Sequence, residues 1–385
     1  MRPRCLAGIT EIGVDSIGKL ADALARPEVL RFENLDTDLS PPNIALNITR
    51  SAVDQDRNNS YLPFVGQARL RRAVAAHVAR LSGLPYDGER NVIISAGGLS
   101  GILNVLLAIV DTDDEVILTD PTYIGLINRV RLAGGLPRLV PFVRDDREWR
   151  LDRDALRKAI SPRTLVLLLM SPSMPSGGVL DRDDWAVVAD LVRDHGLWLV
   201  YDAAMERILY DARSVLHPAS LSGMAEHVIT VGSASKELRL IGWRVGWIVA
   251  PEPIMPDLAL VSMANVAVPV GIAQEAVAVA LELGDQEVAV AVAEWQRRRD
   301  ALLTELDGLP VVRPAGGWSL LLDAGLLGMT GADLSRLFIE KAGVAATAMD
   351  GWGEVNCSRF LRLVFSNEPV ERIRGVGDRI RPALS

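Results

Sequence analysis

One lysine of this chain stands in a setting that suits covalent chemistry. Lys236 lies in the segment VITVGSASKELRLIGWRVGW, shortly after an apolar stretch that predicts a strand. Ser233 and Ser235 precede it at alternate positions, and Arg244 follows eight residues later. Two hydroxyls and a guanidinium near one loop can hold a phosphate. A lysine held beside a bound phosphate is useful because it can form an imine with a carbonyl compound.

The same segment has a second interpretation. Ser233 and Lys236 also have the spacing S-x-x-K, which occurs in penicillin-binding proteins and β-lactamases. Those proteins also carry S-D-N and K-T-G, and neither tripeptide occurs in this chain. Their serine begins a helix, whereas Ser233 follows a predicted buried strand. The sequence therefore favours imine chemistry at Lys236 over acyl transfer at Ser233.

Two further charged residues are predicted to meet a ligand. Asp202 ends the apolar stretch LWLVYD. A carboxylate there could keep a heterocyclic nitrogen protonated, or could simply cap the following turn. Arg362 interrupts the apolar stretch FLRLVFS. Because a buried, unpaired guanidinium is costly, we expect it to have an anionic partner, either a substrate carboxylate or an internal acid.

Glycines and a tyrosine follow two other predicted strands. In ISAGGLSG, glycines that precede a predicted helix could offer backbone N–H groups to a phosphate. The segment is not G-x-G-x-x-G, G-x-x-x-x-G-K-[ST] or G-x-S-x-G, which argues against nicotinamide binding, ATP binding and serine hydrolysis. Tyr123, in DPTYIG, could stack on a planar ring or belong to the core.

The elements that must position these residues alternate along the middle of the chain. Helices are predicted at 69–81, 97–110 and 183–196, and strands at 90–95, 114–120, 137–142, 163–171, 197–202, 227–232 and 246–250. The strands are apolar throughout, which is typical of a sheet covered by helices on both faces. The pattern predicts a mostly parallel, doubly wound α/β sheet, in which ligands bind at the carboxyl ends of the strands.

The pattern changes after about residue 270. One long helical stretch is predicted at 273–306, followed by shorter strands at 319–325, 343–349 and 360–366 and a helix at 331–343. This mixture indicates a smaller α+β domain. We expect a large domain formed by residues 45–270, and a small domain formed by residues 1–44 and 271–385.

The composition limits the class of protein. The chain has 385 residues with 49% hydrophobic and 23% charged residues, which suits packed cores in two domains. The net charge of −8 does not favour binding to nucleic acid or to anionic membranes. The two cysteines, Cys5 and Cys357, form no CxxC, and no HExxH occurs, so neither a disulfide framework nor a metal site is expected. No leader and no apolar run of about 18 residues is visible, so we expect a soluble, cytoplasmic protein.

Taken in order, these segments resemble the class I/II aminotransferase family, which belongs to fold type I of the pyridoxal-phosphate enzymes. The matching segments are SYLPFVGQARLRRAVA, AGGLSG, DPTYIG, SPSMPSGG, YD, SASK with its later arginine, and FLRLVFS. They span roughly residues 30–370, and the SxSK with an arginine eight residues later is the most specific of them. The resemblance implies a fold type I architecture, pyridoxal 5′-phosphate as cofactor, and a homodimer with shared active sites.

The resemblance also implies a role for each matching residue. Lys236 would hold the cofactor as a Schiff base and move the substrate proton through the external aldimine and quinonoid. Asp202 would pair with the pyridine nitrogen, and Arg362 would bind the substrate α-carboxylate. Tyr61 would reach the phosphate of the neighbouring subunit. The remaining contacts would come from Tyr123, stacked on the ring, and from Ser233, Ser235, Arg244 and the amides of Gly98 and Leu99 at the phosphate.

The chain departs from the family pattern at two positions. Where the family has N-P-x-N-P-[TS]-G, this chain has SPSMPSG, which puts Met174 in place of an asparagine. Where the family has D-x-x-Y, this chain has DAAM, which puts Met205 in place of a tyrosine. Both missing residues would donate hydrogen bonds to the 3-oxygen of the cofactor. Without them we expect the pKa of the imine to rise, and two methionines leave an apolar, adaptable surface beside the ring.

These departures leave two kinds of chemistry open. The first is an aminotransferase that acts on an α-amino acid. The alternative is an enzyme of specialised metabolism that catalyses β- or γ-elimination or carbon–carbon bond formation, for example on S-adenosylmethionine. A non-catalytic regulator built on this fold is not favoured, because such proteins carry an added DNA-binding segment and this chain is acidic.

The substrate side chain is less constrained by the sequence. No second arginine is an evident partner for a side-chain carboxylate, so a dicarboxylic substrate is not supported. Trp318 and Trp352 are expected either to approach the site, which would suit a bulky or apolar side chain, or to pack in the core or at an interface. Arg239 and Arg359 are expected to be surface charges.

Overall fold

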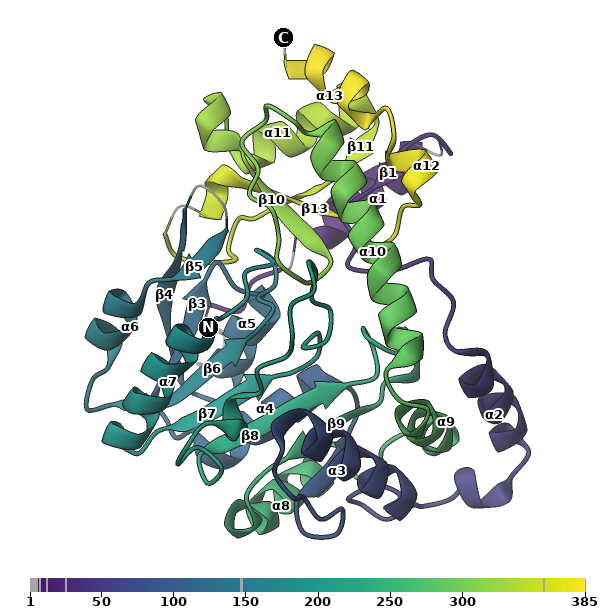
Figure 1. Cartoon of the computed structure of the whole chain (residues 1–385), viewed down its shortest axis with the longest axis vertical. Coiled ribbons are helices and arrows are strands. Elements are labelled where there is room, and N and C mark those ends of the chain that lie inside the picture. Colours follow the sequence, from purple (N-terminus) through teal and green to yellow (C-terminus); the bar gives the residue numbers. More distant parts are fainter. Residues whose placement is uncertain are drawn as a thin grey trace.

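A twisted sheet with helices on both of its faces forms the larger part of the molecule, and a smaller sheet with the C-terminal helices lies beside one edge of this layered unit (Figure 1). The structure is a computed structural model. It describes residues 6, 8–11, 13–24, 26–145, 148–355 and 357–384. Cys5 lies outside these residues.

The large sheet has eight strands in the order β2-β9-β8-β7-β6-β3-β4-β5. Neighbours from β8 to β4 run parallel, whereas β9 is antiparallel to both of its neighbours and β5 is antiparallel to β4. The strands are β2 (Val92–Ser95), β3 (Glu115–Asp120), β4 (Leu136–Arg144), β5 (Trp149–Leu151), β6 (Thr164–Met170), β7 (Trp198–Asp202), β8 (Val228–Ser233) and β9 (Gly246–Val249). The expected mostly parallel, doubly wound sheet is confirmed.

Helices cover both faces because the strands are apolar on both sides. On β6, Val166 and Leu168 belong to a core shared with α4, α5 and α8, whereas Leu167 and Leu169 belong to a core shared with α7. The helices of this layer are α2 (Asn43–Val53), α3 (Ala68–Ser82), α4 (Gly98–Ile109), α5 (Ile124–Leu132), α6 (Arg153–Ala159), α7 (Arg182–His195) and α8 (Met255–Val266). Burial on both faces removes the alternation of a half-exposed strand.

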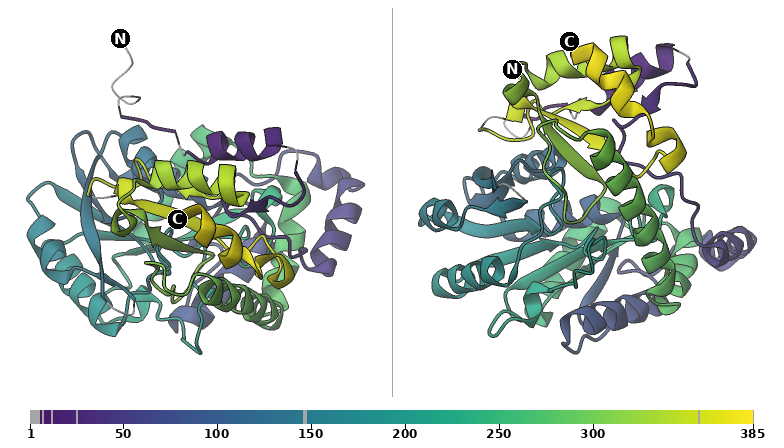
Figure 2. Two further views of the ribbon diagram at one scale, coloured as in Figure 1. Left: turned by 90° about the horizontal axis from the view of Figure 1, so that it is seen from above. Right: turned by 45° about the horizontal axis from the view of Figure 1, so that its top comes forward.

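The smaller sheet is antiparallel and has the order β10-β13-β12, formed by Ser319–Asp323, Phe360–Val364 and Thr347–Ala348. Beside it, β1 (Leu30–Arg31) pairs in parallel with β11 (Val344–Ala345), so the N-terminal segment joins the C-terminal part of the chain (Figure 2). The helices here are α1 (Val14–Leu24), α10 (Gln286–Glu305), α11 (Gly331–Leu337), α12 (Val370–Ile373) and α13 (Val376–Leu384).

The helical stretch predicted at 273–306 forms two helices, because Gly284 adopts a positive φ of 84° between α9 (Gly271–Glu282) and α10. Helix α9 packs against α2 and α3, and α10 crosses to the smaller sheet (Figure 1). The division of the chain into domains at residues 44 and 270 stays a prediction. None of the described helices is long and apolar enough to cross a membrane.

Short helical turns complete the connections. They are η2 (Asp56–Asn58), η3 (Pro218–Ser220), η4 (Ile241–Trp243), η5 (Glu252–Ile254), η6 (Ala324–Leu327), η7 (Phe338–Ala342) and η8 (Cys357–Arg359). The turn η4 lies directly before Arg244, which itself adopts a left-handed conformation with φ 54°. This conformation turns the chain between Lys236 and strand β9.

Candidate active site

A cavity of about 810 Å³ lies where the carboxyl ends of the central strands meet the smaller sheet and the N-terminal segment. Strand register explains part of this meeting, since Asp202 at the end of β7 pairs with Met170 of β6 and with Val231 of β8. Every residue predicted for the site except Tyr61 lines the cavity: Gly98, Leu99, Tyr123, Met174, Asp202, Met205, Ser233, Ser235, Lys236, Arg244 and Arg362.

Lys236 reaches this cavity from the loop that follows β8. Its Nζ donates a hydrogen bond to the backbone oxygen of Leu35 at 2.9 Å and lies 4.9 Å from the ring centre of Trp318. Burial is the main reason that the pKa of Lys236 falls to about 8, with smaller effects from the charges of Arg362 and Arg244. Only a neutral amine attacks a carbonyl, so this environment prepares Lys236 for imine formation near neutral pH.

The residues around Ser233 form a group of hydrogen-bond donors. The Ser233 hydroxyl donates to the Ser235 hydroxyl at 2.9 Å and accepts from the Ser235 backbone N–H at 3.1 Å. Arg244 Nη1 approaches the Ser235 oxygen at 3.4 Å. An exposed guanidinium beside two hydroxyls is a donor set that suits a phosphate.

The start of α4 completes this group of donors. Glycines at positions 97 and 246 allow α4 to come this close, because a side chain at either position would clash. A Cβ at Gly97 would lie 2.4 Å from Nη2 of Arg244, and a Cβ at Gly246 would lie 2.6 Å from the backbone nitrogen of Gly98. The N-terminal amides of α4 therefore come close to Ser233 and Arg244. Helix N-termini favour anions because their N–H groups and the helix dipole point at the ligand.

Asp202 is buried, with 6% of its surface exposed. Its Oδ1 accepts a hydrogen bond from the backbone N–H of Ala204 at 3.1 Å. Burial raises the pKa of Asp202 to about 6, and this hydrogen bond and the charge of Arg129 oppose the shift only in part. A buried carboxylate with so little support suits a cationic partner in the cavity, such as a protonated ring nitrogen.

Arg129, on α5, was not predicted from the sequence. Its Nε donates to the backbone oxygen of Leu99 at 2.7 Å and its Nη1 to that of Gly125 at 2.8 Å. The guanidinium therefore ties α5 to the first turn of α4, and its charge lowers the pKa of Asp202. An arginine in the last turn of a helix carries no sequence signal that would separate it from an ordinary helix-terminal residue.

Arg362, on β13, is 1% exposed. Its Nη2 donates to the backbone oxygen of Glu33 at 2.6 Å, and its Nη1 approaches the Met174 sulfur at 3.7 Å. Among the described residues its Nε has no hydrogen-bond partner and no carboxylate forms an ion pair with it. Burial lowers the pKa of Arg362 to about 10. The predicted internal acid is thus not found in this part of the chain, and a substrate carboxylate is the remaining candidate.

The two tryptophans have different places. Trp352 lines the cavity, with its ring centre 4.7 Å from the Arg362 guanidinium and 5.4 Å from the Tyr123 ring. Trp318 is fully buried behind Lys236 and packs on Trp295 at 5.0 Å. Trp352 can therefore touch a substrate, whereas Trp318 supports the lysine.

Both methionines lie at the cavity. Met174 is 6% exposed and Met205 is 1% exposed, so each presents a small apolar surface to the cavity. The sulfur of Met174 faces Arg362, from whose Nη1 it lies 3.7 Å away. Neither side chain can donate a hydrogen bond to a cofactor oxygen.

Two sequence expectations concerned arginines on the surface, and one of them is wrong. Arg239 is only 8% exposed, because its Nε donates to the backbone oxygen of Ser40 at 2.8 Å and its Nη2 pairs with Glu287 at 3.2 Å. Arg359 keeps 36% of its side chain exposed and pairs with Asp323 at 2.6 Å. A tertiary ion pair explains why Arg239 is buried, and sequence spacing does not show such pairs.

The N-terminal segment forms a wall that the sequence did not predict. Glu11, Ser16 and Lys19 line the cavity from the segment around α1, together with Leu35 further along the chain. The Asn128 side chain fixes the start of this segment, because it exchanges two hydrogen bonds with the backbone of Thr10. The contact joins residues 118 positions apart, so no local pattern could show it.

The chain is similar to known proteins over most of its length. The sequence matches the family described as Aminotransferase class I and II over residues 31–380. It is 30% identical to aromatic-amino-acid aminotransferase 2 of Thermococcus litoralis over 91% of this chain and 90% of that protein. It is 31% identical to the arginine–pyruvate transaminase of Pseudomonas aeruginosa over 90% of both chains. The structure of N-succinyldiaminopimelate aminotransferase from Mycobacterium tuberculosis superposes with a TM-score of 0.92 over the whole of both chains, at 29% identity.

This chain therefore belongs to the class I/II aminotransferase family. It is a pyridoxal-phosphate-dependent aminotransferase with a small-molecule amino acid substrate. The residues of the cavity fit this cofactor: a donor group suited to phosphate, a buried carboxylate suited to a ring nitrogen, and a lysine with a lowered pKa lie around one space. Among the described residues, no group of three or more metal-ligating side chains is present.

The raised pKa of Asp202 predicts a pH-dependent effect on stability. The pKa of Asp202 is about 6 in the folded protein and 3.8 in the unfolded chain. The folded state therefore loses stability as the pH rises through this range. In the cofactor-free protein, Asp202→Asn should therefore increase the free energy of unfolding at pH 7.5 by on the order of 2–3 kcal/mol. At pH 4 the two proteins should be nearly equal. Urea unfolding at both pH values measures the difference, and a variant that is less stable than the parent at pH 7.5 would contradict the prediction.

Proposed function

We propose that Lys236 is the residue to which the cofactor attaches, and that its amine then moves a proton between the substrate Cα and the cofactor. Bound pyridoxal phosphate supplies the electron sink for this chemistry. The observation that carries the proposal is the convergence of Lys236, Asp202 and Arg362 on one cavity from β8, β7 and β13. Burial keeps the Lys236 amine partly neutral, and a neutral amine is needed both to attach the cofactor and to accept the substrate proton.

The other roles follow from the places of the side chains. Asp202 would hold the proton of the ring nitrogen, because its buried carboxylate lacks a full partner in the chain. Tyr123 would stack on the ring. Arg362 would bind the substrate α-carboxylate with its free Nε and the neighbouring Nη group, in the forked geometry that arginine prefers for carboxylates. The phosphate would meet Ser233, Ser235, Arg244 and the amides of Gly98 and Leu99.

The attachment point at Lys236 can be tested directly. Lys236→Ala should abolish attachment of the cofactor by borohydride reduction, because Lys158 and Lys341 do not line the cavity, and Lys19 lines it from α1, away from the Ser233–Ser235 loop. Peptide mass mapping of the reduced parent protein should find the label on Lys236. A label at Lys19, Lys158 or Lys341 instead would overturn the assignment.

The family activity is amino transfer from an amino acid, and we further propose that this protein passes the amino group of an α-amino acid to a keto acid within amino acid metabolism or biosynthesis. The relatives support this proposal, since they are named for transfer from amino acids with different side chains. Met174 and Met205 favour a second candidate reaction beside amino transfer, because they replace the two donors that would face the cofactor 3-oxygen. This second reaction is elimination or carbon–carbon bond formation, for example on S-adenosylmethionine.

One experiment separates the two reactions. Holoenzyme is mixed with one amino acid at a time, and then with S-adenosylmethionine, while the absorbance and the products are followed. We expect about one keto acid per active site without free ammonia, and recovery of the resting absorbance when a keto acid is added. Release of ammonia or of a side-chain leaving group, with no keto acid acceptor required, would instead show the alternative chemistry.

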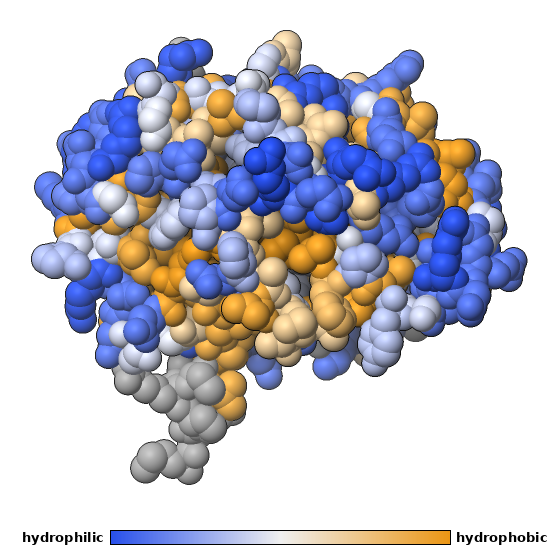
Figure 3. All heavy atoms as spheres, turned by 90° about the horizontal axis from the view of Figure 1, so that it is seen from below, coloured by the Kyte–Doolittle hydropathy of each residue, from blue (hydrophilic) through white to orange (hydrophobic). Residues whose placement is uncertain are grey.

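We also propose that the protein is a homodimer in which Tyr61 contacts the phosphate bound to the other subunit. Tyr61 is 87% exposed and does not line the cavity of its own chain. Phe64, Leu260, Met263 and Val270 are further exposed apolar residues. The face shown in Figure 3 carries a broad apolar area, which is typical of a surface covered by another protein.

Complementation tests the shared site. Tyr61→Ala and Lys236→Ala should each reduce activity strongly as separate homodimers. After the two variants are unfolded and refolded together, mixed dimers should recover up to about a quarter of the parent activity, because half of the dimers are mixed and each has one intact site. Recovery that stays at the level of the separate variants would contradict a shared site. A cytoplasmic location stays a prediction from the sequence.

A further inference from the structure

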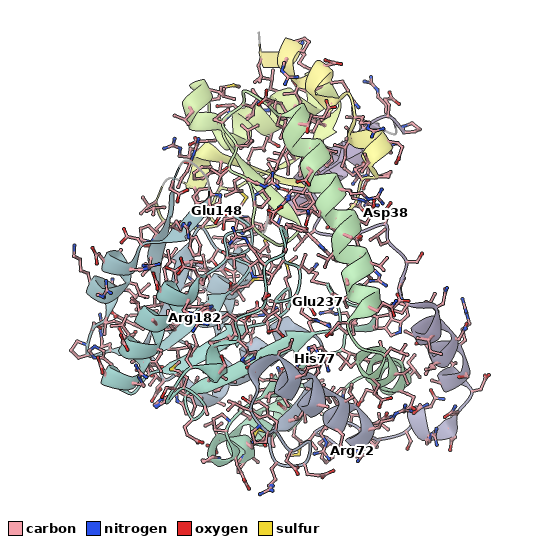
Figure 4. All side chains as sticks on the ribbon, viewed as in Figure 1. Asp38, Arg72, His77, Glu148, Arg182 and Glu237 are labelled. Carbon is pink, nitrogen blue, oxygen red and sulfur yellow. The ribbon has the colours of Figure 1, made fainter. Side chains whose placement is uncertain are left out.

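Behind the cavity lies a pair of buried, oppositely charged side chains that the proposed reaction does not use. Glu237 directly follows Lys236, and Arg207 lies two positions after Met205. Lys236 and Met205 line the cavity, whereas neither Glu237 nor Arg207 does. Only 9% of the Arg207 side chain and 6% of the Glu237 side chain are exposed. Glu237 is labelled in the centre of the molecule in Figure 4.

The contact between them joins backbone as well as side chain. The Arg207 Nε donates to one carboxylate oxygen of Glu237 at 2.6 Å, and the Arg207 backbone N–H donates to the other at 2.7 Å. The carboxylate therefore fixes the position of the turn after β7 itself, not merely the end of a long side chain. That turn begins at Asp202, and the loop of Glu237 carries Lys236.

The residues around Arg207 and Glu237 are buried as well, so this ion pair is shielded from water. Glu206, beside Arg207, is 3% exposed, and burial together with Glu237 raises its pKa well above the usual value. His77 on α3 lies 3.9 Å from Glu206, and burial lowers the pKa of His77. Glu206 and His77 thus lie beside the pair in a buried part of the molecule, and Arg207 also pairs with Asp285 at its exposed end. Buried ion pairs often contribute little net stability, and their best-attested use is to fix register.

We propose that Arg207 and Glu237 are positioning residues, whose buried ion pair sets the distance between Lys236 and the segment that carries Asp202 and Met205. The chemistry needs this distance, because the amine and the carboxylate must act at different ends of one rigid ring. Sheet pairing holds β7 and β8 together as far as Asp202 and Val231, and the bonds between Arg207 and Glu237 hold together the loops that follow these strands. The proposal rests on the proposed roles of Lys236 and Asp202.

The test replaces the pair by uncharged side chains of similar length. In the variant Arg207→Met with Glu237→Met, both charges disappear together, so the net charge near Lys236 is unchanged. We expect a folded protein by circular dichroism, with kcat reduced at least tenfold. In the cofactor-free form, we expect the pKa of Lys236 to rise from about 8 toward its ordinary value, because a looser loop lets water reach the amine. The pH dependence of acylation at Lys236, followed by peptide mass mapping, measures this pKa.

A second variant and a control make the outcome specific. Arg207→Met with Glu237→Gln keeps an acceptor for the backbone N–H of position 207. Relative to the first variant, it should recover part of kcat and part of the lowering of the Lys236 pKa. This variant also carries the test if the first does not fold. Asp285→Asn removes the other carboxylate bound to Arg207, at its exposed end, and should leave kcat within about twofold of the parent.

Failure of the clamp and failure of the proposed function give different results. Borohydride labelling of every variant shows whether the cofactor is attached at Lys236, so labelling elsewhere rejects the proposed function. Labelling at Lys236 with an unchanged kcat and an unchanged Lys236 pKa in the folded double variants rejects the clamp alone. If Asp285→Asn lowers kcat as much as the first variant does, the clamp is also rejected. Loss of any negative charge beside Arg207 would then explain the result.

Discussion

The site depends on the burial of ionisable groups that the chain itself only partly satisfies. Burial moves the pKa of Lys236 down to about 8, that of Asp202 up to about 6 and that of Arg362 down to about 10. In each case the charged form is disfavoured, because water is excluded and no full counter-charge replaces it. Such groups bind a charged cofactor or substrate well, since the bound molecule supplies the missing partner. The same burial weakens the fold without that partner, which links cofactor binding to stability.

Two kinds of contact hold the buried charged groups of the site in place. Glycines at positions 97 and 246 let α4, β9 and the guanidinium of Arg244 approach more closely than any Cβ would allow. Hydrogen bonds from Arg129 to the backbone of Leu99 and Gly125, and the bonds between Arg207 and Glu237, fix loops through their backbones. Backbone contacts leave less freedom than contacts between long side chains, whose rotamers must also be ordered. A rigid frame of this kind positions catalytic groups before the substrate arrives.

Two methionines set this cavity apart from the pattern of its family. Met174 and Met205 put thioethers where hydrogen-bond donors to the cofactor oxygen are expected, and the Met174 sulfur faces Arg362 instead. The change therefore touches both the cofactor side and the substrate-carboxylate side of the cavity. Because methionine is flexible and polarizable, the same positions also allow side chains of different shapes beside the ring.

The amino-acid sequence was enough to predict the fold class and a group of residues that line one cavity. Apolar strands without alternation indicated a doubly covered sheet, and ordered motifs pointed to Lys236, Asp202 and Arg362, because each of these residues lies at or shortly after a strand end, or within a strand, that the apolar pattern marks. Tertiary structure alone decided which charges are buried and what they meet. Arg239, Arg129 and the pair of Arg207 with Glu237 look like ordinary polar residues in the sequence, and the wall around Lys19 lies far from the motifs. Their partners are distant in the chain, and only the folded arrangement brings such groups together and excludes water from them.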